Sequence, residues 1–91
     1  MALPTQYSAK AYATAQLAMA NLKSAVYILL QEAGSDGMRN VDIGKALGIY
    51  SGHVRHEGHI PRTLLAIMQS EGVVEQDQAE RWCLKGINQA E

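Results

Sequence analysis

Three histidines stand three residues apart in the segment YSGHVRHEGHIPRTLL, residues 50–65. They are His53, His56 and His59. Imidazole is a common metal ligand and changes its charge near neutral pH, so this spacing raises three hypotheses: a metal site, a pH switch or a nucleic-acid surface. Glycines within the segment disfavour the helix that would stack the three rings on one face.

A metal site here would need a fourth ligand, for which Glu57 and Cys83 are the candidates. The sequence has no CxxC or HExxH pattern, and Cys83 falls within an apolar run. The other two interpretations are a polar loop with solvated or backbone-capping histidines, and a surface that contacts nucleic acid. We favour the nucleic-acid surface and expect no metal and no cofactor.

Arginine and hydroxyl side chains accompany the histidines. Arg55 and Arg62 are candidates for base recognition, because a guanidinium can donate two hydrogen bonds to guanine. A surface ion pair with Glu57 or Glu71 is the alternative for Arg62. A solvated charge is the alternative for Lys45, and a helix cap is the alternative for Ser51. The candidate DNA-binding residues are Arg39, Lys45, Ser51, His53, Arg55, His56, Arg62 and Thr63.

The charge of the chain is unevenly distributed. Its formal net charge of −1 argues against a protein that coats nucleic acid indiscriminately. Four basic residues accompany two acidic ones between Arg39 and Arg62, whereas acidic residues predominate from Glu71 onward. A nucleic-acid surface is therefore expected in the middle of the chain.

Patterns typical of enzymes and of membrane proteins do not occur in the sequence. No serine stands in a nucleophile elbow, and GSDG and GKALG lack the phosphate-loop pattern. We therefore expect no enzymatic activity. The single cysteine fits a reducing compartment, and we see neither a signal peptide nor an apolar stretch that would span a bilayer. These features predict a cytoplasmic protein with no membrane partner.

The length of 91 residues, 47% of them hydrophobic, predicts one small folded domain. Residues 8–33 contain no proline or glycine and are rich in alanine, which predicts helix up to Gly34. Whether this is one long helix or two joined near Asn21 stays open. The apolar stripe expected to face the core is Leu22, Val26, Leu29, Leu30 and Ala33.

Shorter elements are expected after the SDG turn. Met38 and Arg39 predict a strand fragment, and Asn40 predicts the N-cap of a helix that ends at Gly48. The apolar residues of that helix expected to point inward are Val41, Ile43, Ala46 and Leu47.

A second short helix and a hairpin complete the expected elements. Pro61 fits the first position of a helix that ends at Gly72. GVVEQ and RWCLK flank the polar turn DQAE and predict a β-hairpin, with Trp82 and Met68 in the core. The predicted apolar face of the helix is Ile60, Leu64, Ile67 and Met68.

This order of elements resembles the winged helix-turn-helix family of DNA-binding domains. The resemblance runs from Leu22 to Lys85 and is carried by AVYILLQEAG, GMRNVDIGKALGI, PRTLLAIMQSEGVVEQ and the later WCL. It implies that the helix beginning near Pro61 enters the major groove of DNA. The chain departs from the family pattern in its long connection from Ile49 to Ile60. It departs also in its acidic hairpin, which carries Glu75, Asp77 and Glu80.

The prediction is a mainly α fold with a small antiparallel β-hairpin. It is a winged helix-turn-helix domain over residues 22–86, with an N-terminal helical extension over 1–21 and a tail over 87–91. The resemblance implies a DNA-binding protein, either a transcriptional regulator or an accessory module. The alternative is a protein–protein interaction module without nucleic acid. The expected partners are double-stranded DNA and a second copy of the chain, held as a homodimer by the extension.

Overall fold

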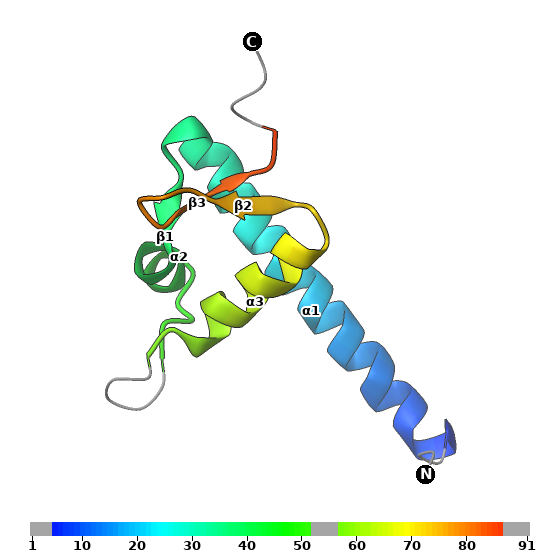
Figure 1. Ribbon diagram of the computed structural model, residues 1–91. Coiled ribbons are helices and arrows are strands. Elements are labelled where there is room, and N and C mark those ends of the chain that lie inside the picture. The colour runs from blue at the N-terminus through cyan, green and yellow to red at the C-terminus, as the bar shows by residue number, and fades with distance from the viewer. Residues whose placement is uncertain (1–4, 52–56, 87–91) are drawn as a thin grey trace.

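The computed structural model describes residues 5–51 and 57–86 and is mainly helical, with one small antiparallel sheet (Figure 1). This confirms the predicted class of secondary structure, including the hairpin. The elements are α1 (Thr5–Ala33), a 3-10 turn (Gly34–Asp36), β1 (Met38–Arg39), α2 (Asn40–Ala46), α3 (His59–Ser70), β2 (Val74–Gln76) and β3 (Arg81–Leu84).

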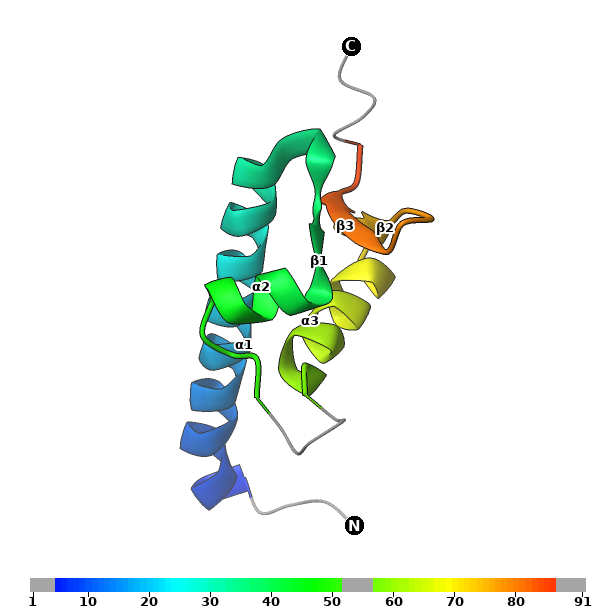
Figure 2. The same ribbon diagram turned by 90° about the vertical axis from the view of Figure 1, so that its left-hand side faces the viewer.

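The first helix is continuous, which answers the question of one helix or two. Its alanines and unbranched side chains favour helix throughout, and no proline or glycine interrupts it. Only its C-terminal half packs on the domain, where Val26 and Leu30 are completely buried. The N-terminal half projects beyond the other elements, blue in Figures 1 and 2, and residues 9–18 are all exposed.

The sheet joins three short strands in the order β1-β3-β2, with both pairings antiparallel. The predicted strand fragment is β1, which places Met38 opposite Trp82 and Arg39 opposite Arg81. The turn of the hairpin is closed by Asp77, whose Oδ1 accepts the backbone N–H groups of Ala79 and Arg81 at 2.8 and 2.9 Å. An aspartate that accepts such bonds favours a tight turn.

Helix α2 begins one residue earlier than expected from capping. Asn40 is its first helical residue, the cap position is Arg39, and no side chain caps the end. The prediction of Asn40 as an N-cap is therefore wrong, because its amide is directed to the loop before α3. Ile43 is buried as predicted, whereas Ala46 is exposed, since this helix of only two turns buries a narrow stripe.

Helix α3 begins two residues before Pro61, so the proline is not at the first helical position. A proline in the first turn removes an N–H that has no intrahelical acceptor there. The predicted apolar face is also partly wrong, because Ile60 is 42% exposed. The buried stripe is rotated by about one residue, which follows from the burial of the proline ring. It consists of Pro61, Leu64, Leu65 and Met68.

The core lies between the C-terminal half of α1, helix α3 and the sheet. Trp82 and Met68 are buried in it, as predicted. Cys83 is buried beside them, and desolvation raises the pKa of its thiol, as do the carboxylates of Asp77, Glu75 and Asp36. In the part of the chain that the structure describes, no helix has the length and apolarity needed to cross a bilayer.

Candidate functional site

Two arginines far apart in the sequence line one polar hollow of 220 Å³. Arg39 stands at the end of β1, and its position follows from the pairing of β1 with β3. Arg62 stands in the first turn of α3 and is exposed because its neighbours Pro61 and Leu64 face the core. The remaining lining residues are Asn40, Val41, Tyr50, Gln76 and Glu80.

Asn40 is a half-buried polar side chain that lines this hollow. Its Nδ2 donates to the carbonyl oxygen of Gly58 at 3.4 Å. Its Oδ1 is buried and has no hydrogen-bond partner among the described residues. An acceptor left unpaired in this way costs free energy, so it favours a ligand or solvent donor in the hollow.

Glycine at position 58 is needed for this arrangement. Gly58 has φ of 85°, and a methyl group there would lie 2.8 Å from both Asn40 Nδ2 and Tyr50 Cε1. Tyr50 is half-buried and packs between Gly58 and Gly44. The loop before α3 therefore rests directly on α2.

Arg62 contacts the backbone of Glu57 rather than forming an ion pair with the Glu57 carboxylate. Its Nη2 donates to the Glu57 carbonyl oxygen at 3.3 Å. Glu71, the other predicted partner, pairs instead with Lys23 at 3.0 Å, and this is the one salt bridge among the described residues. A neutral acceptor thus orients the guanidinium of Arg62, and the positive charge of this group is exposed at the surface.

The exposed face of α3 carries polar and small side chains together with Ile60. No carboxylate occurs between His59 and Ser70, and Arg62 with Thr63 lies near the start of the face. A surface of this kind can approach a polyanion without like-charge repulsion. The exposed residues are His59, Ile60, Arg62, Thr63, Ala66, Gln69 and Ser70.

The other predicted site residues that the structure describes do not line this hollow. Lys45 is exposed on α2, with its Nζ 5.7 Å from the centre of the Tyr50 ring. Ser51 is exposed, and its carbonyl oxygen accepts the N–H of Gly58 at 3.2 Å. His53, Arg55 and His56 lie outside the described residues. Over residues 8–51 and 57–86, no three potential ligands gather that could hold a metal ion.

Acidic groups border the arginine-lined hollow on the hairpin side. Glu80, at φ of 65°, contributes to its lining, and Glu75 and Asp77 are exposed nearby on the hairpin. Arg81 lies opposite Arg39 across the strands. The hollow therefore combines two guanidinium groups with one carboxylate.

Five residues that line the hollow are not among the candidate site residues predicted from the sequence, namely Asn40, Val41, Tyr50, Gln76 and Glu80. Among them, Asn40 is predicted as a helix cap, and Gln76 is predicted only as part of the strand run GVVEQ. No sequence pattern signals either residue, because each reaches the hollow only through pairing of β1 and β2 with β3. Comparisons of the chain with protein-family models, with curated proteins and with solved structures return no match.

Proposed function

We propose that this chain is a DNA-binding protein of winged helix-turn-helix type, in which the exposed face of α3 enters the major groove. The observation that carries the proposal is the hollow lined by Arg39 and Arg62 beside a helix face without carboxylates. A guanidinium can donate to a phosphate or to guanine, and Thr63 can donate to either. Transcriptional regulation or an accessory role at DNA follows as the broader function.

Within this proposal, Arg62 and Thr63 contact bases, because they lie in the first two turns of the helix that enters the groove. Arg39 contacts a phosphate at the edge of the groove, from the other side of the hollow. Lys45 contacts the phosphate backbone from α2, with its stem held beside the Tyr50 ring. Backbone contacts of this kind position the protein and do not read sequence.

The test is a gel-shift titration of the full chain with mixed duplex fragments, followed by a selected site. Arg62→Ala should weaken binding to the selected site by about 1–3 kcal/mol and relax the preference at one base pair. Lys45→Ala should weaken binding to all sequences alike. Lys85→Ala is the matched control, because it removes one charge at the end of β3 remote from Arg39. Equal effects of all three substitutions would contradict the proposed groove contacts.

A second candidate function is a protein–protein interaction module that uses the same fold without nucleic acid. It is favoured by the acidic hairpin, where Glu75, Asp77 and Glu80 are exposed and would repel phosphates. Glu80→Gln discriminates between the two functions. It should strengthen DNA binding if phosphates approach the hollow, and it should leave a folded protein without DNA affinity if they do not.

A further inference from the structure

The outer face of α1 carries small and apolar side chains that the rest of the domain leaves exposed. Its seam is Ala13, Leu17, Ala20, Ser24 and Tyr27, which alternate in steps of four and three residues. Such spacing keeps side chains on one side of a helix and is typical of paired helices. Leu17 is 63% exposed and Tyr27 is 43% exposed.

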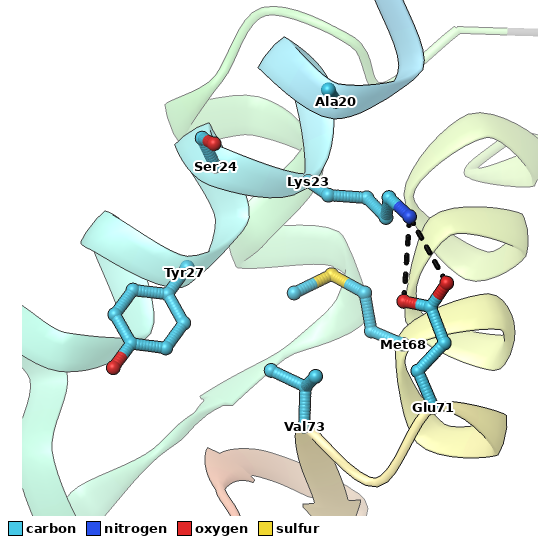
Figure 3. Close-up of a pocket in the computed structure, with 7 residues that line it drawn as sticks. All are labelled: Ala20, Lys23, Ser24, Tyr27, Met68, Glu71 and Val73. Atoms are coloured by element: carbon cyan, nitrogen blue, oxygen red, sulfur yellow. Dashed lines mark hydrogen bonds and ion pairs between the residues drawn. The ribbon is translucent and has the colours of Figure 1, made fainter. Parts of the chain in front are cut away.

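A hollow of 280 Å³ opens on this face, between α1 and the end of α3 (Figure 3). Ala20, Ser24 and Tyr27 of the seam follow one another along its α1 side, and Met68 and Val73 reach into it from the other side. The hollow is open because two of the seam residues that line it, Ala20 and Ser24, have small side chains. The Lys23–Glu71 ion pair joins α1 to the C-cap of α3 and forms part of the lining.

Leu17 projects from the same face but does not line the hollow of its own chain. In a pair of copies related by a two-fold axis, each contact from one residue to another occurs twice. If Leu17 of one copy enters the hollow near Ser24 of the other, the axis must pass about midway between these positions, close to Asn21. Asn21 is exposed, and the adjacent Ala20 allows the helices to approach closely.

The charges on α1 select the antiparallel orientation. Between residues 8 and 33 the charged side chains are Lys10, Lys23 and Glu32, and Lys23 is engaged by Glu71. Lys10 and Glu32 lie equally far from Asn21 along the helix, on opposite sides of it. An antiparallel pair centred there therefore brings Lys10 of each copy beside Glu32 of the other. A parallel pair would bring like charges together instead.

We propose that two copies of this chain pair through the outer faces of antiparallel α1 helices that cross near Asn21. Leu17 of each copy fills the hollow of the other, between Ser24, Tyr27 and Met68. The pairing covers the projecting half of a helix that has few contacts within its own domain. A helical segment without such packing is marginally stable in water. The proposed dimer does not depend on whether α3 binds DNA.

Sedimentation equilibrium of the full chain tests whether the outer face of α1 forms the dimer. The wild type should be dimeric at tens of micromolar. Leu17→Glu should lower the association constant at least about 100-fold, because each dimer loses two buried leucines and gains two buried charges. Ala18→Glu adds the same charge in the same turn on another exposed face and should leave the constant unchanged. A monomeric wild type would overturn the proposal, as would a stronger effect of Ala18→Glu than of Leu17→Glu.

Disulfide cross-linking tests the orientation, since the only native cysteine, Cys83, is buried. Lys10→Cys mixed with Glu32→Cys should give a covalent heterodimer on mild oxidation. Lys10→Cys alone should give little cross-link, because the two copies of that position lie about 33 Å apart along antiparallel helices. Efficient cross-linking of Lys10→Cys with itself would show a parallel pair and overturn the proposed arrangement. Circular dichroism of each variant checks that the fold is retained.

Discussion

Gly37 immediately precedes β1 and sets the direction in which that strand meets β3. Its φ of 68° and ψ of −175° are backbone angles adopted almost only by glycine. A methyl group at this position would lie 2.7 Å from both the Cys83 sulfur and the Trp82 carbonyl oxygen. Gly37→Ala therefore combines backbone strain with a clash against the central strand.

The cost of Gly37→Ala can be worked from these two effects. The strained backbone costs about 1–3 kcal/mol. Overpacking against β3 costs about another 1–3 kcal/mol. The sum of about 2–6 kcal/mol is a large part of the about 5–14 kcal/mol expected for a chain of this length. Gly34→Ala is the matched control, because Gly34 also has positive φ, at 65°, but a methyl group added there would have no atom within 4 Å. It should cost about 1–2 kcal/mol.

Urea unfolding at one protein concentration measures both variants through the fluorescence of Trp82, the single tryptophan, which is buried. The free energy of unfolding should fall at least about 1 kcal/mol further for Gly37→Ala than for Gly34→Ala. Equal losses would refute the reasoning, because they would show that β3 does not press on Gly37.

Three further changes have expected outcomes. Gly44→Ala should lower the melting temperature despite the helix propensity of alanine, because the methyl group would lie 2.8 Å from the Tyr50 ring. Lys23→Ala should cost less than about 1 kcal/mol in urea unfolding, because its ion pair with Glu71 is partly exposed. The raised pKa of Cys83 stabilises the fold below the ordinary thiol pKa, and this contribution is lost as pH rises through the raised value. The stability advantage of the wild type over Cys83→Ala should therefore shrink as pH rises above the ordinary thiol pKa.

Local sequence signals predicted the elements whose formation depends on neighbouring residues. The apolar spacing of Val26 and Leu30 identified the buried side of α1, and the turn DQAE between two β-rich runs identified the hairpin. The SDG turn likewise marked the end of α1. In each case the physical cause, whether periodicity or turn chemistry, lies within a few residues of the feature.

Features that depend on contacts distant in the sequence could not be predicted in the same way. Two neighbouring stripes of α3 are both apolar, so the sequence does not decide whether Pro61 or Ile60 is buried. The packing of α3 on α2 decides it. The residues around Asn40 predict a helix cap, yet its amide donates a hydrogen bond to Gly58, which is 18 residues away. Residue type alone led to eight candidate site residues, but the hollow that Arg39 and Arg62 share could be found only from the fold.

The most direct test of the proposed function is the salt dependence of duplex DNA binding by the wild-type chain. If Arg39 and Lys45 neutralise phosphates while Arg62 contacts bases, the logarithm of the binding constant should fall with the logarithm of salt concentration with a slope of about −2. Each phosphate contact contributes about −0.9 to that slope. Absence of binding to any duplex at low salt, in a protein that circular dichroism shows to be folded, would contradict DNA binding and leave the interaction module.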